Sequence, residues 1–296
     1  MWLADQWNDY EVIDCSKGEK LERWGDYLLV RPDPQVIWDT PKKEKGWRKM
    51  NGHYHRSSKG GGEWEFFQLP KEWTIQYSLP INKKLTFHLK PFSFKHTGLF
   101  PEQAANWNWF SQLIADAVSK GRQVKVLNLF AYTGGATLAA AAAGASVTHV
   151  DASKGMVTWA KENAISSGLK DAPIRWLVDD CLKFVEREIR RGNHYDAIIM
   201  DPPSYGRGPK GEIWKIEESV YPLIQLCSQI LTDNPLFFLI NSYTTGLQPA
   251  VLSYMISTVL GTANGTVTAS EIGLPVSSNG LVLPCGASGR YEATGI

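Results

Sequence analysis

Hydrophobic and polar positions follow different patterns in the two parts of the chain. Before about residue 95, short apolar runs with a two-residue alternation are separated by turn residues, at 10–14, 26–32, 63–69, 73–79 and 85–89. This alternation is typical of β-strands that bury one face. The pattern therefore predicts a small β-rich domain over residues 1–95, in which residues 59–62 (Lys-Gly-Gly-Gly) form a loop or a hairpin tip.

From about residue 101, helical periods alternate with short apolar runs. The expected helices cover 107–121, 137–145, 154–168, 181–192 and 217–231, and the expected strands cover 124–130, 146–151, 174–178, 195–201 and 235–241. This βαβ alternation predicts an α/β, Rossmann-like and mostly parallel sheet with helices on both faces. The last two runs, 266–276 and 280–291, are joined so tightly that they predict an antiparallel C-terminal hairpin. We expect this second domain to span residues 96–296.

Composition narrows the class of protein. Apolar residues make up 43% of the 296 residues and charged residues 21%, as in soluble globular proteins. The formal net charge of +1 provides no global basic field for nucleic acid, although a local patch can serve. The four cysteines are far apart and form no CxxC pair, so we expect neither a metal site nor a disulfide framework. The polar N-terminus and the absence of long apolar runs predict a cytoplasmic protein without a membrane segment. The sequence carries no signal for an oligomeric state.

Aromatic and basic residues gather in the first part of the chain. Nine of the twelve tryptophans lie in the first 110 residues, where they either fill a thin core or stack on RNA bases. The stretch 42–59 holds seven lysines and arginines with Trp47, His53, Tyr54 and His55 between them. Such a run is either a solvated surface or an RNA-facing one, so RNA binding by residues 1–95 is an open prediction.

Adjacent glycines after a buried strand mark a candidate ligand site. In open α/β sheets the ligand lies beyond the carboxyl ends of the strands, where Gly134 and Gly135 let the backbone approach it closely. Asp151 ends the next strand, where a carboxylate accepts ribose hydroxyls, and Asp179 and Asp180 after the third strand can reach an adenine amino group. The dinucleotide fingerprint G-x-G-x-x-G would occupy the same place, but neither its spaced glycines nor a pyrophosphate cradle is evident. S-adenosylmethionine, which has no phosphate, fits this pattern better.

A second motif, Asp201-Pro202-Pro203-Ser204-Tyr205, follows the fourth strand. Two successive prolines make a stiff backbone that lacks N–H donors, so its carbonyls can only accept hydrogen bonds. Such a loop suits a planar, nitrogen-bearing group, with Tyr205 stacked on its face. We therefore predict that Asp201, Pro202 and Tyr205 position the target of the reaction.

Several motifs together resemble a known family. NLFAYTGGATLAAAAAGA (128–145), VDAS (150–153) and DPPSY (201–205) are similar to class I S-adenosylmethionine-dependent methyltransferases of the family that includes the 23S ribosomal RNA large-subunit methyltransferases. HTGLFPEQ (96–103) resembles a segment that precedes the sheet in this family, and residues 21–38 resemble the N-terminal region of its shorter members. The resemblance covers essentially the whole chain, and its motifs are specific for the cofactor rather than for the substrate.

The resemblance implies a set of cofactor contacts, with Phe100 and Gln103 closing over the methionine end. The implied residues are Phe100, Gln103, Phe130, Tyr132, Thr133, Gly134, Asp151, Ser153, Asp180 and Asp201. The implied reaction consumes S-adenosylmethionine, releases S-adenosylhomocysteine and needs no metal.

The methylated atom is constrained by a missing cysteine. Family members that methylate carbon 5 of cytosine need a cysteine nucleophile after the fifth strand, where this chain has Asn241-Ser242-Tyr243. Direct transfer to a base nitrogen of ribosomal RNA is then the leading interpretation, catalysed mainly by approach geometry. A methyltransferase acting on a protein side chain or a small molecule remains an alternative, as does a non-catalytic RNA-binding protein.

Overall fold

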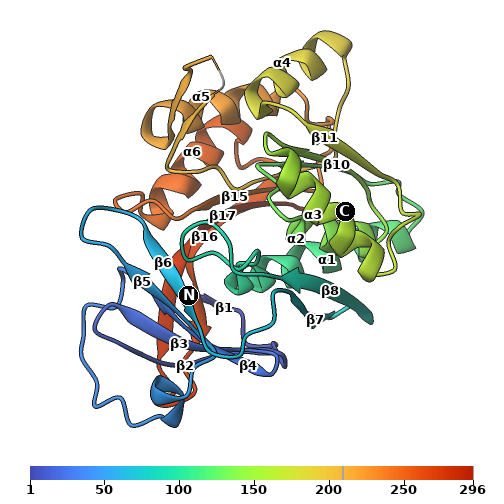
Figure 1. Ribbon diagram of the computed structural model, residues 1–296. Coiled ribbons are helices and arrows are strands. Elements are labelled where there is room, and N and C mark those ends of the chain that lie inside the picture. Colours follow the sequence, from blue (N-terminus) through green and yellow to red (C-terminus); the bar gives the residue numbers. More distant parts are fainter. Residues whose placement is uncertain (209, 296) are drawn as a thin grey trace.

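The computed structural model describes residues 1–208 and 210–295, and its central feature is one eight-stranded sheet (Figure 1). The strands lie in the order β1-β16-β17-β15-β12-β9-β10-β11. From β15 to β11 neighbouring strands are parallel, while β16 and β17 form an antiparallel hairpin on β15. Their bounds are β1 Trp2–Leu3, β9 Lys125–Leu129, β10 Ser146–Asp151, β11 Ile174–Val178, β12 Ala197–Met200, β15 Phe237–Ser242, β16 Gly265–Pro275 and β17 Val282–Ala293. The predicted Rossmann-like sheet with its antiparallel C-terminal hairpin is confirmed.

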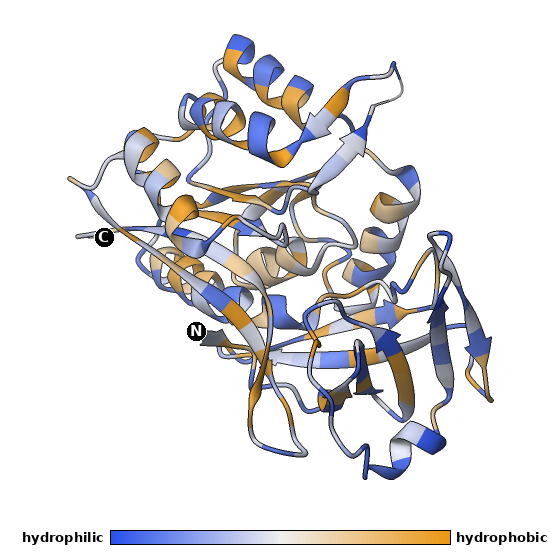
Figure 2. Cartoon of the chain, turned by 90° about the vertical axis from the view of Figure 1, so that its left-hand side faces the viewer, coloured by the Kyte–Doolittle hydropathy of each residue, from blue (hydrophilic) through white to orange (hydrophobic). Residues whose placement is uncertain are grey.

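Strand alternation divides the core into two layers. In β12, Ala197 and Ile199 face the same core as α1 and α2, whereas Ile198 and Met200 face the core of α4, α5 and α6. Figure 2 shows hydrophobic residues concentrated in the central strands and on the helix faces that cover them. The helices are α1 Ala104–Ser119, α2 Gly135–Ala142, α3 Lys154–Ser166, α4 Cys181–Arg191, α5 Ile216–Ser228 and α6 Pro249–Leu260. Helix α6 was not among the expected elements.

The N-terminal part is β-rich, as predicted. A five-stranded sheet in the order β2-β3-β4-β5-β6 is followed by a separate β7–β8 hairpin. The bounds are β2 Tyr10–Ser16, β3 Glu19–Trp24, β4 Tyr27–Pro32, β5 Gly52–Arg56, β6 Gly62–Phe66, β7 Trp73–Leu79 and β8 Lys83–Leu89, with a short 3-10 helix, η1, at Lys45–Arg48. Residues 59–61 of the predicted tip lie in the turn between β5 and β6, which is closed by a hydrogen bond from Ser57 N to Gly61 O (3.0 Å), and Gly62 begins β6. Strands β3 and β5 were not expected.

The two parts of the chain share one continuous core. Eight of the nine N-terminal tryptophans are buried or half-buried, which confirms core filling as their main role, and Trp38 is the exposed exception. Trp7 packs against Tyr77 and Trp107, and its indole N–H donates to Pro101 O (2.9 Å). The C-terminal hairpin reaches the N-terminal sheet, where Ser277 N donates to Val12 O (2.9 Å) (Figure 1). The division between residues 95 and 96 stays a prediction.

Within residues 1–208 and 210–295, no helix is both long and apolar enough to cross a membrane.

Candidate active site

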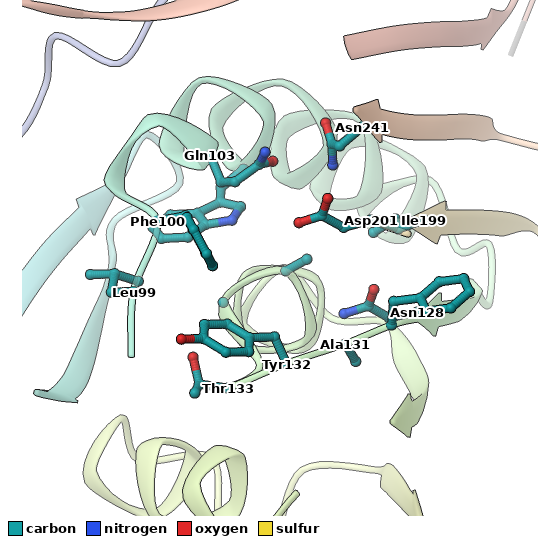
Figure 3. A pocket seen from close by; sticks show the side chains of 14 residues that line it. Leu99, Phe100, Gln103, Asn128, Ala131, Tyr132, Thr133, Ile199, Asp201 and Asn241 are labelled. Atoms are coloured by element: carbon teal, nitrogen blue, oxygen red, sulfur yellow. The ribbon is translucent and has the colours of Figure 1, made fainter. Parts of the chain in front are cut away.

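The carboxyl ends of four parallel strands gather most of the predicted site residues at one edge of the sheet. The strand β9 is flanked by β10 on one side and β12 on the other, so the strand order reverses at β9. Crevices at such switch points are the usual ligand sites of open α/β sheets. A pocket lies there (Figure 3), lined by Leu99, Phe100, Gln103, Trp107, Asn128, Phe130, Ala131, Tyr132, Thr133, Gly135, Ala136, Ile199, Asp201 and Asn241.

Six of the predicted site residues line this pocket, and six lie around it. The lining residues are Phe100, Gln103, Phe130, Tyr132, Thr133 and Asp201. The remainder are Gly134, Asp151, Ser153, Asp180, Pro202 and Tyr205. A residue outside the lining can still shape the pocket by holding the backbone of a lining residue, as Asp151 does for Tyr132.

The loop after β9 has an unusual backbone. Phe130 and Tyr132 have φ angles of 55° and 53°, in the left-handed region that residues with a side chain rarely adopt. Such strain costs of order 1 kcal/mol per residue and is found mainly at functional sites. The surroundings hold the loop in place, since Thr133 Oγ1 donates to Gly98 O (2.5 Å) and Asn163 Nδ2 donates to Thr133 O (2.9 Å).

The two glycines of this loop are required by packing as well as by conformation. Gly134 has a φ of 87° and caps the N-terminus of α2. A Cβ on Gly135 would lie 2.6 Å from the ring of Trp107, which lines the pocket. Glycine at this position therefore lets α2 lie close to the wall of the pocket, in addition to the close ligand approach expected from the sequence.

Asp151 fixes the loop through its carboxylate. It accepts hydrogen bonds from Tyr132 N (2.9 Å) and Ser153 N (2.8 Å), one on each oxygen. Burial raises the pKa of this carboxyl, and the two backbone donors oppose the shift. Each oxygen keeps a free lone pair, so a ligand hydroxyl can still donate to it. Ser153 in turn caps α3, where its Oγ accepts from Met156 N (3.3 Å).

The acidic pair after β11 separates into two roles. Asp179 forms an ion pair with Arg187. Asp180 is exposed and caps α4 by accepting from Lys183 N (2.9 Å). No salt bridge to Asp180 is found within the described part of the chain, so its second oxygen remains available to a ligand.

Asp201 is a half-buried carboxyl at the pocket wall. Desolvation, and next the nearby Glu102 carboxylate, raise its pKa from 3.8 to about 7. The buried Glu102 side chain also has a raised pKa, chiefly because of desolvation. The lining residues include no lysine or arginine. A cationic ligand would therefore supply the positive charge that stabilises the ionised form of Asp201.

The prolines of the second motif are held at the rim, and Tyr205 lies outside the pocket lining. Pro202 is buried, and Pro203 O accepts from the Trp214 indole N–H (2.7 Å). Tyr205 begins β13 (Tyr205–Arg207), which pairs with β14 (Ile213–Lys215), and its hydroxyl accepts from Arg207 Nε (2.9 Å). The side chain of Tyr205 is exposed and is not among the residues that line the pocket.

Asn241 is a pocket residue that the sequence analysis did not select. Met200 of β12 pairs with Ile240 of β15. The next residue of each chain segment, Asp201 and Asn241, therefore lies beside the other (Figure 3). Asn241 Oδ1 accepts from Asn106 Nδ2 (3.1 Å) and Ser288 Oγ (2.6 Å). With its oxygen held in this way, the amide nitrogen is left as a donor beside Asp201. Its only sequence signal was a polar residue at the end of the apolar strand at 235–241.

Gln103 belongs to the same polar network. Its Oε1 accepts from Asn106 Nδ2 (3.0 Å), and its Nε2 donates to the Tyr243 hydroxyl (2.7 Å). These bonds tie the segment before α1 to the end of β15 and thereby close one side of the pocket. Asn128 and Trp107, which were also missed, line the floor and wall from β9 and α1.

No cysteine is among the residues that line the pocket. Burial raises the pKa of all four thiols, that of Cys15 to about 11, and the Glu102 carboxylate adds to the shift at Cys285. A thiol with a raised pKa is a poor nucleophile, because the thiolate is the reactive form. Within residues 1–208 and 210–295, no group of three or more His, Cys, Asp or Glu side chains is arranged to hold a metal ion.

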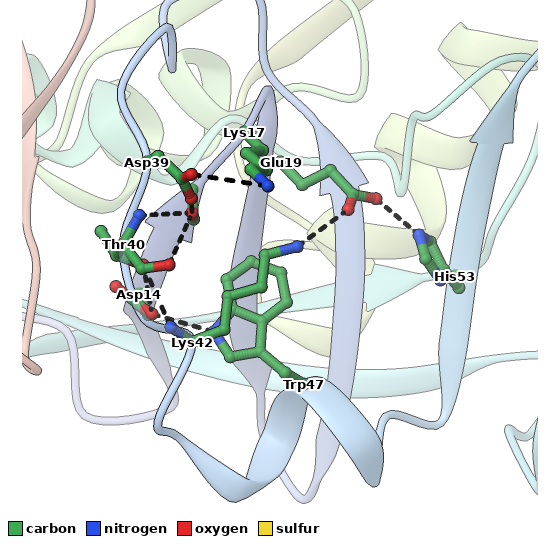
Figure 4. Close-up of polar contacts among 9 residues, drawn as sticks. Asp14, Lys17, Glu19, Asp39, Thr40, Lys42, Trp47 and His53 are labelled. Atoms are coloured by element: carbon green, nitrogen blue, oxygen red, sulfur yellow. Dashed lines mark hydrogen bonds and ion pairs between the residues drawn. The ribbon is translucent and has the colours of Figure 1, made fainter.

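The basic stretch 42–59 is partly neutralised within the N-terminal sheet (Figure 4). Lys42 and His53 both contact the Glu19 carboxylate, at 3.5 and 2.5 Å. Trp47 is buried beneath Lys42, and its indole N–H donates to Asp14 Oδ2 (2.9 Å). Tyr54 is buried as well. Neither ring is free to stack on a base, and RNA binding by the rest of this stretch stays a prediction.

Comparisons with known proteins identify the family. The family model described as S-adenosylmethionine-dependent methyltransferase matches residues 69–216, half of the chain. A SAM-dependent methyltransferase from Agrobacterium tumefaciens is 36% identical, with a TM-score of 0.88 over 97% of this chain and 91% of that one. A protein described as a methyltransferase complexed with SAH has a TM-score of 0.72 at 20% identity over 97% of this chain and 76% of that one, which shows the shared fold alone.

Two curated relatives carry the name ribosomal RNA large subunit methyltransferase K/L. The one from Pseudoalteromonas atlantica is 28% identical over 76% of this chain, and the one from Shewanella oneidensis is 33% identical over 78%. The chain spans about a third of the length of these relatives, 33% and 31% respectively. The motifs, the switch-point pocket and the matches over nearly the full chain agree, and the chain belongs to the S-adenosylmethionine-dependent methyltransferase family.

Proposed function

We propose that the protein transfers a methyl group from S-adenosylmethionine to a nitrogen of a base in ribosomal RNA. The observation that carries the proposal is the pairing of Asp201, an acceptor, with Asn241, a fixed donor, in a pocket that no cysteine lines. The names of the curated relatives support ribosomal RNA as the substrate class.

The residues around the pocket suit the proposed cofactor. Asp151 keeps lone pairs for ribose hydroxyls, and Asp180 is free to accept from an adenine amino group. The other cofactor residues implied by the resemblance line the pocket or belong to the loops around it. They are Phe100, Gln103, Phe130, Tyr132, Thr133, Gly134 and Ser153. S-adenosylmethionine, when bound, supplies a methyl group attached to a positively charged sulfur.

Charge in the pocket supports this fit. A cation favours the ionised form of a nearby carboxyl, so the raised pKa of Asp201 falls when a positively charged sulfur is present. Asp201 then becomes a full acceptor for N–H groups of the target.

The target base would be held by groups with opposite hydrogen-bonding character. Asp201 and the carbonyl of Pro202 accept from an amino or ring N–H, while Asn241 donates its amide N–H to a base oxygen or ring nitrogen. This orients the base so that a nitrogen lone pair faces the methyl group. Holding reactants in line contributes about 7–11 kcal/mol to lowering the barrier. Tyr205, on its exposed hairpin, would contact the substrate at the rim, rather than inside the pocket.

The proposal is tested with tritiated methyl transfer from S-adenosylmethionine to ribosomal RNA, to whole-cell protein and to small-molecule extract. We expect label in RNA, recovered as an N-methylated nucleoside after digestion. Asp201→Ala should abolish transfer and leave most of the cofactor affinity, and Asp116→Ala, an exposed position on α1, is the matched control. Label confined to protein or to small molecules would refute the proposed substrate, and 5-methylcytosine would refute direct transfer to nitrogen.

A further inference from the structure

The β5–β6 hairpin has two faces of different chemistry. Residues that lie opposite each other in a strand register share a face of the sheet. One face carries aromatic rings, one guanidinium and no carboxylate from either strand; its pairs are Gly52 with Phe66, Tyr54 with Trp64, and Arg56 with Gly62. We call this surface the aromatic face.

The acidic residues of the hairpin lie on the opposite face. Glu63 and Glu65 stand opposite His55 and His53, and the carboxylate of Glu65 contacts His55 Nε2 at 3.2 Å. His53 contacts Glu19 on the same side (Figure 4). The carboxylates of the hairpin therefore lie on that face, and the aromatic face carries the exposed Arg56 cation.

Two rings near the hairpin are open to solvent: Phe66 lies on the aromatic face, and Phe94 is tied to it through a backbone carbonyl that accepts a hydrogen bond from Trp64. Phe66 is 55% exposed and lies nearly parallel to Trp64, with ring centroids 6.0 Å apart and an interplanar angle of 9°. Phe94 is 63% exposed, and its backbone has a φ of 60°. A bulky residue in this left-handed region is uncommon and costs conformational energy. Exposed rings form a surface that buries more apolar area once a partner covers it, and Arg56 supplies a cation at the other end of the same face.

The aromatic face is hydrogen-bonded to the segment of chain that leads to the pocket. The Trp64 indole N–H is shared between Phe92 O (3.2 Å) and Phe94 O (2.9 Å). The chain then runs from Phe94 into Leu99 and Phe100, which line the pocket. Figure 1 shows β6 beside this segment, on the way to α1. Residues 94–100 therefore connect the aromatic face with the wall of the pocket.

We propose that the aromatic face binds the nucleotides that flank the target base in a single-stranded RNA, and this rests on the proposed function. Bases stack on Phe66 and Phe94, and a phosphate lies beside Arg56. Stacking on aromatic rings tolerates any base, and a nearby cation attracts the backbone, as in other single-strand sites. Because Glu63 and Glu65 lie on the opposite face of the hairpin, their carboxylates do not stand beside the phosphates that they would repel.

The test measures binding of a fluorescein-labelled single-stranded RNA of about 10 nucleotides to the full chain by fluorescence anisotropy. Phe66→Ala and Phe94→Ala should each weaken binding by roughly 5-fold or more, since stacking contributes about 1–3 kcal/mol per base. Arg56→Gln should weaken binding and reduce the slope of log Kd against log salt by about 1. Tyr254→Ala, which removes a ring that is 77% exposed on α6, is the matched control and should change nothing.

Methyl transfer separates this inference from the proposed function. The double variant Phe66→Ala/Phe94→Ala should raise the KM for RNA and leave the affinity for S-adenosylhomocysteine, measured by calorimetry, unchanged. If the wild-type protein methylates RNA but the double variant keeps its Kd and KM within about two-fold, the docking surface is refuted and the function stands. Equal weakening by Tyr254→Ala refutes it as well. If the wild-type protein methylates only protein, both proposals fall.

Discussion

Replacing Asp201 by asparagine should stabilise the free protein at alkaline pH and not at acid pH. The folded state raises the pKa of this carboxyl from 3.8 to about 7, through burial and the neighbouring Glu102. The unfolded chain therefore loses the proton near pH 4, whereas the folded protein keeps it until about pH 7. Stability falls as pH rises across that interval, and the full cost is present above it.

The magnitude follows from the size of the shift. About three pKa units correspond to an upper bound of about 4 kcal/mol at 1.36 kcal/mol per unit. The side chain is only half-buried, so water screens much of this cost and about 1–2 kcal/mol remains. Asparagine has nearly the same shape and carries no charge, so it avoids the cost entirely.

Urea denaturation of the wild-type protein and of Asp201→Asn at pH 5 and pH 8 measures the effect. The variant should gain about 1 kcal/mol over the wild type between the two pH values, because part of the full cost is already present at pH 5. Glu102→Gln in a protein that keeps Asp201 should reduce the loss of stability between pH 5 and pH 8, because it removes the second cause of the raised pKa of Asp201. Asp116→Asn, at an exposed position that water already solvates, is the control. An Asp201→Asn variant that is no more stable than wild type at pH 8 would show that the carboxyl is not desolvated.

Four further outcomes are expected. The affinity for S-adenosylmethionine relative to S-adenosylhomocysteine should rise several-fold from pH 6 to pH 8, because only the former carries the cation that Asp201 attracts when ionised; calorimetry at both pH values tests this. Asp151→Ala should weaken S-adenosylhomocysteine binding by roughly 10- to 100-fold, since charge-assisted hydrogen bonds contribute about 1.5–3 kcal/mol, and an unchanged Kd would contradict its assignment to the ribose. Gly135→Ala should lower the free energy of unfolding by about 1–3 kcal/mol, because the added Cβ would lie 2.6 Å from Trp107; thermal denaturation measures the loss. Cys285→Ser should keep kcat for methyl transfer within about three-fold, and complete loss would restore a thiol mechanism.

The strands that sequence patterns predicted are those with apolar periodicity, and the missed ones are polar. Strand β3 contains Glu22, whose buried carboxylate is held by Arg31 on β4 at 2.6 Å. Strand β5 carries His53, whose partner Glu19 lies on β3. Charged residues read as surface until their partners are known, and these partners come from other strands. Helix α6 was missed for the opposite reason: it is apolar on nearly all sides, although Leu252 and Ile256 alone are fully buried, so no period stands out.

In the candidate site, too, the predicted residues are those with a local sequence signal, and the missed ones depend on contacts with distant parts of the chain. Residues of the loops after β9 and β12 were predicted because each motif is local, with its glycines or prolines adjacent in sequence. Trp107, which lines the pocket, and Glu102, which raises the pKa of Asp201, were not predicted, since they approach the site only when the segment from 101 and α1 packs against the sheet. Tyr205 lies four residues after Asp201, but the chain turns there into the β13–β14 hairpin and the ring is exposed, so its role in positioning the target stays a prediction.

The direction of the Asn241 amide depends on the tertiary structure most of all. Its oxygen is held by Asn106 from α1 and Ser288 from β17, which are 135 and 47 residues away in sequence. Sequence comparison registers only that a cysteine is missing at the end of the fifth strand. The structure adds that the position carries a hydrogen-bond donor fixed beside Asp201. In the proposed reaction, the covalent attack used by cytosine enzymes is therefore replaced by a donor and an acceptor that hold the base. It follows that losing either Ser288 or Asn106 would let the amide rotate, and would impair methyl transfer while leaving the cofactor contacts at Asp151 intact.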